Sequence, residues 1–305
     1  MRGFRVASSV RSFLAVPATS EKMVGKGVAS GADGLFLDLE DAVAPGEKEG
    51  ARRGVVQAFT GVDFGGKARM FRMNALDTPY FYGDVIEVVE GAGESVDAIL
   101  VPKVGRAGDL YALDVLLSAV EAGCRLEIGK VRLEAQIESA EGLENVYDIA
   151  RSTRRLTTLH FGPGDFAASI GAPQASIGVW DEWDEAYPGH RFGYAMQRIV
   201  IAARATGLRA YDGPTANYRD QDALRESCRL ARALGYDGKW CIHPAQIDVV
   251  NEVFSPTAEE VERAKKVVAA YEEANAAGSG AIVVDGEMVD AASIRMARDT
   301  LGRSR

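Results

Sequence analysis

Residues 131–165 read VRLEAQIESAEGLENVYDIARSTRRLTTLHFGPGD. The apolar runs at 131–137 and 156–161 have the length of buried strands, and between them apolar residues return at helical spacing. That stripe consists of Leu143, Val146, Tyr147 and Ala150. A strand, a helix and a second strand in this order predict one parallel βαβ unit.

The same alternation of apolar runs and helix-period segments extends along most of the 305 residues. Strands are expected at 12–17, 34–39, 68–73, 98–101, 131–137, 156–161, 208–211 and 238–242. Eight parallel strands with helices between them predict an α/β fold of the TIM (β/α)8 barrel type. We therefore expect a catalytic barrel domain over residues 1–253.

Residues 254–305 follow the predicted barrel and are expected to form a C-terminal helical extension. A helix should begin near Ser255, a glycine-rich linker covers 278–280, Asp285-Gly286 is a turn signal, and a last helix should follow Asp290. An extension of this length is expected to be too small for a core of its own. It is predicted to pack, as a lid, on the barrel or on a neighbouring subunit.

The composition argues against several classes of function. A net charge of −9 offers no basic face for DNA or RNA, and no apolar run reaches the roughly 18 residues of a membrane span. The N-terminal segment has the composition of a transit peptide, but the strand expected at 12–17 leaves too few residues ahead of it. Cys124, Cys228 and Cys241 lack CxxC spacing and are expected to be reduced thiols, which indicates a cytoplasmic protein.

Polar residues collect where the apolar strands end. In a TIM barrel the chemistry lies on the loops after the carboxyl ends of the strands, so these residues are the informative ones. They are Asp38, Glu40, Asp41, Arg72, Asn74, Pro102, Lys103, Glu138, Gly162, Pro163, Gly164, Asp165, Asp212 and His243.

Several carboxylates on one rim would repel each other unless a cation lies among them. Magnesium takes oxygen ligands from one or two carboxylates and the rest from water and substrate, which Glu138 and Asp165 on adjacent strands could provide. Any one of these acids could instead be a solvated loop residue or a member of a salt bridge. Their clustering favours the magnesium site.

The histidines do not predict zinc. His160, His190 and His243 form no HxH or HExxH pattern, and the sequence contains no GxSxG elbow for a serine nucleophile. His243, which precedes Pro244, is expected to brace the end of the eighth strand.

Four segments carry a family resemblance: 11–17 (RSFLAVP), 38–43 (DLEDAV), 101–103 (VPK) and 137–140 (IESA). They resemble the citrate lyase β-subunit/HpcH-HpaI aldolase superfamily, and the resemblance covers nearly the whole chain. Within that superfamily the chain is most similar to the L-malyl-CoA/β-methylmalyl-CoA lyases. The segments that carry this closer likeness are 74–78 (NALDT), 238–244 (GKWCIHP), 251–256 (NEVFSP) and 291–297 (AASIRMA).

The resemblance implies roles for particular residues. Glu138 and Asp165 would hold Mg²⁺, with Mn²⁺ as a possible substitute, and Arg72 would contact a substrate oxygen. Asp290 would be the catalytic acid/base, delivered from a neighbouring subunit of a homotrimer or homohexamer. The residues expected to hold the CoA phosphates are Arg11, Lys22 and Lys26. The residues expected to contact substrate beside Arg72 are Glu40, Asp41, Lys103, Gly164 and Asp165.

The reaction implied by the resemblance is reversible, magnesium-dependent cleavage of a 3-hydroxyacyl-CoA. L-malyl-CoA or β-methylmalyl-CoA would yield glyoxylate and acetyl-CoA or propionyl-CoA. The alternatives are a citramalyl-CoA or citryl thioester lyase, a malyl-CoA thioesterase, and a CoA-binding scaffold without activity. The loops 213–218 and 178–190 depart from the family pattern, and both bear on which 2-oxo acid is used.

Overall fold

Eight parallel strands close into a barrel in the computed structural model of this protein, which describes residues 10–187, 190–276 and 282–304. The strands are β1 (Ser12–Pro17), β2 (Gly34–Asp38), β3 (Ala68–Arg72), β4 (Ala98–Val101), β5 (Arg132–Ile137), β6 (Leu156–Phe161), β7 (Arg209–Asp212) and β8 (Gly238–Cys241). Each strand pairs in parallel with its neighbours in sequence, and β1 pairs with β8. The predicted TIM (β/α)8 fold is confirmed, and no predicted strand end is off by more than one residue.

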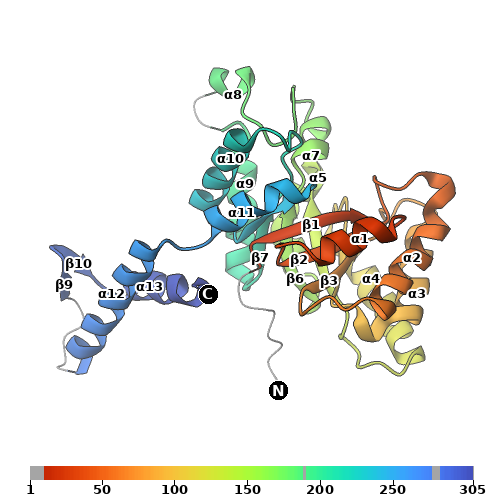
Figure 1. Ribbon diagram of the computed structural model, residues 1–305, viewed down its shortest axis with the longest axis horizontal. Coiled ribbons are helices and arrows are strands. Elements are labelled where there is room, and N and C mark those ends of the chain that lie inside the picture. The colour runs from red at the N-terminus through yellow and green to blue at the C-terminus, as the bar shows by residue number, and fades with distance from the viewer. Residues whose placement is uncertain (1–9, 188–189, 277–281, 305) are drawn as a thin grey trace. The chain divides into compact units, whose positions relative to one another are not determined.

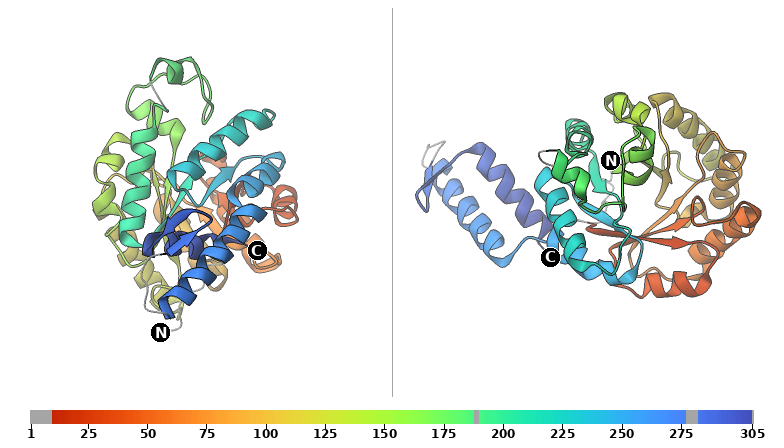
Figure 2. Two further views of the ribbon diagram at one scale, coloured as in Figure 1. Left: turned by 90° about the vertical axis from the view of Figure 1, so that its left-hand side faces the viewer. Right: turned by 90° about the horizontal axis from the view of Figure 1, so that it is seen from above.

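Helices form the outer layer around these strands (Figures 1 and 2). They are α1 (Glu21–Val28), α2 (Lys48–Gly61), α3 (Phe81–Ala92), α4 (Ala107–Gly123), α5 (Ala140–Glu144), α6 (Val146–Ile149), α7 (Pro163–Ser169), α9 (Gly193–Thr206), α10 (Gln221–Leu234) and α11 (Ile247–Phe254). The short helix α8 (Glu182–Ala186) lies in the connection between α7 and α9, outside this layer (Figure 1). Short 3₁₀ turns are η1 (Pro45–Glu47), η2 (Gly93–Ser95) and η3 (Pro244–Gln246). None of the helices in the described ranges is long and apolar enough to cross a membrane.

Large side chains fill the interior of the barrel. Phe13, Phe36, Tyr211 and Trp240 belong to one buried cluster, and His160 stacks on Tyr211 with ring centroids 5.4 Å apart. The Trp240 indole N–H donates to His160 Nδ1 at 2.8 Å, so the ring's proton lies on Nε2, 2.5 Å from Glu134 Oε2. His160 is therefore part of a satisfied core network.

The cysteines are free thiols, as predicted. Cys228 and Cys241 are buried, whereas Cys124 is only half-buried. Burial raises the pKa of the Cys228 thiol to about 12, so that thiol is protonated and unreactive at neutral pH.

Contacts divide the chain into two compact units, one of which contains Val10–Asn251. The C-terminal unit comprises α12 (Ala258–Ala276), a hairpin of β9 (Ile282–Val284) and β10 (Glu287–Val289), and α13 (Ala291–Arg303). Asp285 and Gly286 have φ of 49° and 83° and form the predicted turn of that hairpin. The linker expected at 278–280 and the transit-peptide-like residues 1–9 lie outside the described residues.

The expectation that the C-terminal extension lacks a core of its own is wrong. Ala264, Val267, Val289, Ile294 and Ala297 form a buried cluster within it. Its two helices are amphipathic, and together with the hairpin they give enough apolar surface to exclude water locally. Packing of this unit on a neighbouring subunit remains a prediction.

The strands β1 and β8 pack so closely, where the barrel closes, that no side chain fits at Gly238. A Cβ added to Gly238 would collide with the backbone carbonyl of Arg11, which also accepts the Lys239 N–H at 2.9 Å. We expect Gly238→Ala to destabilise the protein by about 1–3 kcal/mol, because the backbone cannot move aside as a flexible side chain would.

Gly108 is the matched control. No atom lies within 4 Å of a Cβ built there, and Gly108 is in the first turn of α4, so Gly108→Ala should add about 0.5–1 kcal/mol of stability. Thermal unfolding followed by circular dichroism compares the two variants with the wild type. A Gly238→Ala protein as stable as the wild type would contradict the packing described here.

Candidate active site at the carboxyl end of the barrel

A cavity of about 390 Å³ opens where the barrel strands end. Its charged wall consists of Asp38, Asp41, Arg72, Glu138 and Asp165. Its other walls consist mainly of apolar side chains and of the turn after β6: Ala15, Val16, Pro17, Phe36, Ala42, Gln136, Gly162, Pro163, Gly164, Ile177, Pro214, Trp240 and Ile242. A pocket with apolar walls and a few convergent charges is typical of a small-molecule site.

Arg72, the last residue of β3, is the cationic centre of this cavity. Its Nε and Nη2 donate to the two carboxylate oxygens of Asp38, the last residue of β2, at 2.8 and 2.6 Å. Burial lowers the pKa of Arg72, but the charge and hydrogen bonds of Asp38, together with the charges of Glu40 and Asp41, raise it by more, so the guanidinium stays charged. Burial raises the pKa of Asp38, but Arg72 and the backbone N–H groups of Glu40 and Ala42 together lower it by more, so Asp38 stays ionised.

The loop after β2 is held from two sides. Asp38 accepts the backbone N–H groups of Glu40 and Ala42 at 2.9 and 3.2 Å. The buried Lys48 ammonium also donates to the carbonyl oxygens of Leu39 and Glu40, each at 2.7 Å. These bonds fix the position of Glu40 beside Arg72.

Glu40 stands beside the cavity but is not one of the residues that line it. Its Oε2 lies 2.7 Å from Arg72 Nη1 and its Oε1 lies 3.2 Å from Lys103 Nζ. Neither ion pair has the alignment of a hydrogen bond, so both oxygens are buried without a hydrogen-bond donor among the described residues. Burial raises the pKa of Glu40, and the charge of Asp41 adds to the rise; the charges of Arg72 and Lys103 lower the pKa but do not cancel the effect of burial.

Glu138 directly follows β5 and is only 2% exposed. Its Oε1 accepts the backbone N–H of Lys103 at 2.8 Å, and its Oε2 accepts from the Gln136 amide. Lys103 reaches this position with a φ of 52°, a left-handed conformation that is unusual for a lysine. Burial first, and then the charges of Glu40 and Asp165, raise the pKa of Glu138 well above its ordinary value.

The turn after β6 brings the second predicted ligand to the same cavity. A Cβ at Gly162 would lie 2.5 Å from Glu138 Oε2, so only glycine allows the chain to pass this close to the carboxylate. Asp165 follows in the first turn of α7; it is exposed, and no described residue donates a hydrogen bond to it or forms an ion pair with it. Its oxygens are therefore available to a ligand.

These residues fit a magnesium ion. No group of three or more His, Cys, Asp or Glu side chains forms a metal cage among the described residues. Magnesium does not need such a cage, because it is commonly held by one or two carboxylates while water and substrate complete its coordination. A divalent cation would also relieve the repulsion that raises the pKa of Glu138.

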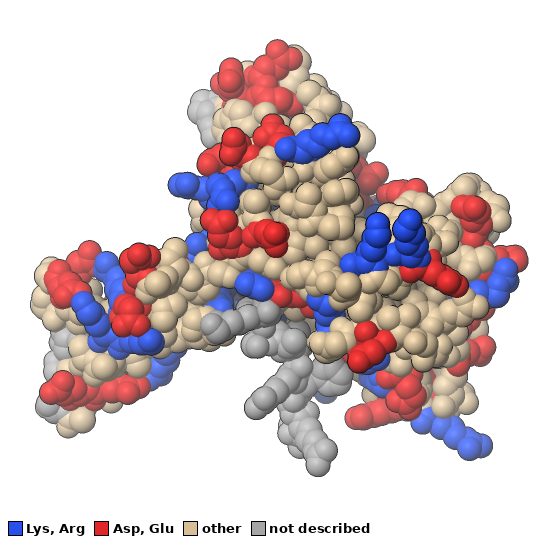
Figure 3. Space-filling model, in the orientation of Figure 1, with Lys and Arg blue, Asp and Glu red and all other residues tan. Residues whose placement is uncertain are grey.

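Other predicted residues belong to other elements of the chain. Asp290 belongs to the C-terminal unit, where its carboxylate caps α13 by accepting the N–H groups of Ala292 and Ser293 at 2.9 and 3.0 Å. Lys22 and Lys26 are exposed on α1, the helix after β1, and basic side chains gather over this helix in Figure 3.

Arg11 lies at the opposite end of β1 from the cavity. Arg11 precedes β1, roughly 20 Å of strand away from the Pro17 end that lines the cavity. Its Nε and Nη2 donate to the carboxylate oxygens of Asp33 at 2.8 and 3.0 Å. Arg11 therefore helps to close the amino end of the barrel and does not lie near a ligand at the carboxyl end.

Sequence reasoning missed two residues of the site, Gln136 and Ile177. Asp38 was predicted as a strand-end residue, but its pairing with Arg72 was not. Gln136 alternates with Glu138 on β5, and this period of two could have placed it on the same inner face. Ile177 lies in a long loop, and no periodicity in the sequence points to it.

His243 has the bracing role expected of it. Its Nδ1 accepts the Ala245 N–H at 3.1 Å at the start of η3, and its ring stacks on Tyr218 with centroids 4.1 Å apart. It is not among the residues that line the cavity.

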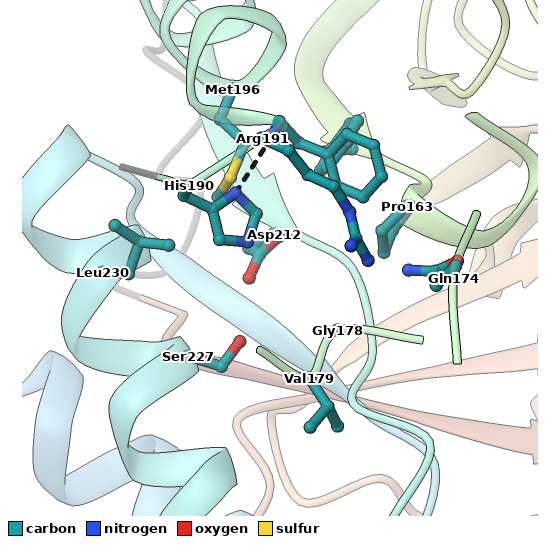
Figure 4. A pocket seen from close by; sticks show the side chains of 12 residues that line it. Pro163, Gln174, Gly178, Val179, His190, Arg191, Met196, Asp212, Ser227 and Leu230 are labelled. Atoms are coloured by element: carbon teal, nitrogen blue, oxygen red, sulfur yellow. Dashed lines mark hydrogen bonds between the residues drawn. The ribbon is translucent and has the colours of Figure 1, made fainter. Parts of the chain in front are cut away.

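A second cavity, of about 20 Å³, lies beside β7 and is drawn in Figure 4. His190 and Asp212 line it, and the Phe192 N–H donates to His190 Nδ1 at 3.2 Å. Asp212 is already engaged by the buried Lys239 ammonium. A volume of this size holds one or two water molecules at about 10–15 Å³ each, so it is not a substrate site.

Comparisons with known proteins point to one family. The family model described as HpcH/HpaI aldolase/citrate lyase matches residues 11–244. The chain is 41% identical to an L-malyl-CoA/beta-methylmalyl-CoA lyase of Rhodobacter capsulatus, over 92% of this chain and 89% of that one. It is 36% identical to a (3S)-malyl-CoA thioesterase of Cereibacter sphaeroides, over 98% and 95%.

A solved structure extends the comparison to ligands. The chain is similar to the protein CitE from Mycobacterium tuberculosis in complex with magnesium, acetoacetate and coenzyme A. The TM-score is 0.77 at 26% identity, and the match covers 97% of this chain and 98% of that one.

The raised pKa of Glu138 predicts that this carboxylate weakens the metal-free fold. A carboxyl whose pKa rises on folding loses stability as the pH rises above its unfolded value, near 4.5. In EDTA at pH 7, Glu138→Gln should therefore raise the free energy of unfolding by about 1 kcal/mol or more. The buried Gln136 Oε1 has no hydrogen-bond donor among the described residues, so a flip of that amide would satisfy the new side chain.

Urea unfolding at pH 4 and pH 7 checks this prediction, and the difference from wild type should shrink at pH 4. Glu141→Gln is the control, because Glu141 is exposed and pairs with Arg106 at the surface. A Glu138→Gln variant less stable than the wild type at pH 7 would show that the charge of Glu138 is well compensated without a cation.

Proposed function

The chain belongs to the HpcH/HpaI aldolase/citrate lyase family, and from that premise we propose that it is a magnesium-dependent carbon–carbon lyase for short acyl-CoA thioesters. Its substrates would be L-malyl-CoA or β-methylmalyl-CoA, split reversibly into glyoxylate and acetyl-CoA or propionyl-CoA. The observation that carries the proposal is one cavity lined by a fixed guanidinium, Arg72, and two carboxylates, Glu138 and Asp165. Such a cavity can hold a cation and a keto acid together.

Glu138 and Asp165 would hold the ion. When bound, Mg²⁺ supplies Lewis-acid polarisation of a 2-oxo acid and neutralises part of the charge on this wall. Gln136 and the Lys103 backbone N–H keep the Glu138 carboxylate in place through their hydrogen bonds.

Arg72 would stabilise negative charge as it develops on a substrate oxygen. Asp38 accepts hydrogen bonds from Nε and from one N–H of Nη2, so the guanidinium cannot rotate. Its remaining N–H groups, on Nη1 and Nη2, are left for other contacts and for substrate. A preorganised, desolvated donor of this kind acts strongly on a developing oxyanion. Asp38 is the positioning residue in this arrangement.

Asp290 would move the proton at the α-carbon of the acyl-CoA. Hydrogen bonds from the backbone N–H groups of Ser293 and Ala292 lower the pKa of Asp290, so it is ionised at neutral pH and able to accept a proton. A carboxylate of low pKa is a weak base, so the reaction depends on strong stabilisation of the enolate by Arg72. Delivery of Asp290 from a neighbouring subunit is part of this proposal.

Lys22 and Lys26 would attract the phosphates of the CoA thioester. Residues four apart on a helix lie on the same face, so the two ammonium groups of α1 can act on one anion. A TIM barrel places its binding loops at the end of the strands where α1 begins.

A single assay tests the reaction. Protein, Mg²⁺, acetyl-CoA and glyoxylate should yield malyl-CoA on chromatography, and EDTA should abolish the product. Asp290→Asn should reduce turnover by about 10² or more while CoA binding is retained. Because asparagine caps a helix as well as aspartate does, this variant keeps the structural role of Asp290 and removes the base.

Asp285→Asn, in the turn of the hairpin that precedes Asp290, is the matched control, since asparagine tolerates the positive φ found there. Its turnover should equal that of the wild type. Undiminished product in EDTA, or from Asp290→Asn, would refute the mechanism. Release of free thiol from malyl-CoA without glyoxylate would instead indicate hydrolysis, the activity named for the 36% identical relative.

A further inference from the structure

One apolar residue of the cavity wall, Ile177, lies in a different kind of segment from the others. Pro214 lies two residues after β7, Ile242 directly follows β8, and Phe36 and Trp240 lie in strands. Ile177 instead comes from the long connection between α7 and α8. The barrel itself does not determine which side chain stands at this point of the wall.

Ile177 lies against the turn that carries the proposed metal ligand. Its Cδ1 would be 3.0 Å, and its Cγ1 3.4 Å, from a Cβ built on Gly164. Gly164 immediately precedes Asp165, and both line the cavity together with Ile177. A keto acid held next to Asp165 would therefore have this branched side chain beside it.

Backbone contacts hold Ile177 in place. Its carbonyl oxygen accepts the Ala216 N–H at 2.9 Å, and the Thr215 hydroxyl donates to the Gly178 carbonyl at 3.4 Å. Gly178 has a φ of 69°, and a Cβ there would collide with the Pro214 carbonyl oxygen. These contacts join the Ile177 segment to the loop after β7, so the side chain is not on a freely moving loop.

An ion pair holds the end of the connection between α7 and α8 in place. Asp181 accepts the Ala175 N–H at 3.1 Å and pairs with the Arg191 guanidinium at 2.5 Å, and both side chains of the pair are largely buried. A buried, bidentate pair of this kind has the geometry that restricts both partners. A wall residue fixed from both ends can exclude a ligand group by size.

We propose that Ile177 determines which 2-oxo acid the site accepts, by filling the space beside Gly164 and Asp165 that a substituent on the keto carbon would need. Glyoxylate carries hydrogen there and fits, whereas pyruvate and 2-oxobutyrate carry a methyl and an ethyl group and are disfavoured. This inference rests on the proposed function, because it assumes that a 2-oxo acid binds next to Asp165.

The test measures kcat/KM for glyoxylate, pyruvate and 2-oxobutyrate, each with acetyl-CoA and Mg²⁺. Ile177→Ala should raise the pyruvate-to-glyoxylate ratio about tenfold, the discrimination expected from a few methyl groups of pocket volume. Ile177→Phe should lower it. Because the ratio is internal to each preparation, partial misfolding of a variant does not change it.

Ile170→Ala is the matched control. Ile170 is an exposed isoleucine just after α7 and does not line the cavity, so its ratio should match that of the wild type. The inference is overturned, and the proposed function retained, if wild-type enzyme uses pyruvate as readily as glyoxylate or if both Ile177 variants leave the ratio unchanged.

Calorimetric binding of glyoxylate and pyruvate in the presence of Mg²⁺ separates the two ideas. If the wild type binds these acids but forms no carbon–carbon bond, the proposed function fails, and the binding ratios of the variants then decide the role of Ile177. If no 2-oxo acid binds, both are overturned.

Discussion

Glu40, Glu138 and Asp165 crowd together at the carboxyl end of the barrel, where Arg72 and Lys103 provide positive charge. Glu40 and Glu138 are buried there, and both have raised pKa values, so the neighbouring cations do not fully compensate them. Unrelieved repulsion of this kind lowers stability, and it is common at functional sites. A divalent ion between Glu138 and Asp165 would resolve the imbalance, and the same ion would bind a 2-oxo acid.

The two units of the chain divide the proposed chemistry. The barrel carries the groups that would bind and polarise the oxo acid, whereas the proposed base, Asp290, belongs to the C-terminal unit. Asp290 also caps α13, and that cap lowers its pKa. An ionised but weakly basic carboxylate suits a reaction in which Arg72 provides most of the stabilisation of the negative oxygen.

Much of the barrel could be predicted from the sequence, because buried parallel strands are short apolar runs and each rim residue follows its strand directly. Glu138 and Asp165 were placed on one rim by this rule, and both line the cavity. The pairing of Arg11 with Asp33 before β1 could not be predicted, because the motif does not show which end of the strand its arginine faces. Ile177 was missed because its position depends on contacts with Gly164 and Ala216, which are distant enough in sequence to leave no local signal. The core of the C-terminal unit was missed because chain length was used in place of the apolar faces that its helices bury against each other.

The most direct test of the account is the position of a bound divalent ion. Crystals grown with Mn²⁺ and glyoxylate, measured at a wavelength where manganese scatters anomalously, would locate it. The account predicts a single anomalous peak that lies within about 2.0–2.3 Å of one carboxylate oxygen of Glu138 and one carboxylate oxygen of Asp165, with glyoxylate oxygens completing the coordination. No peak in this cavity at millimolar Mn²⁺, or a peak that neither carboxylate contacts, would contradict it.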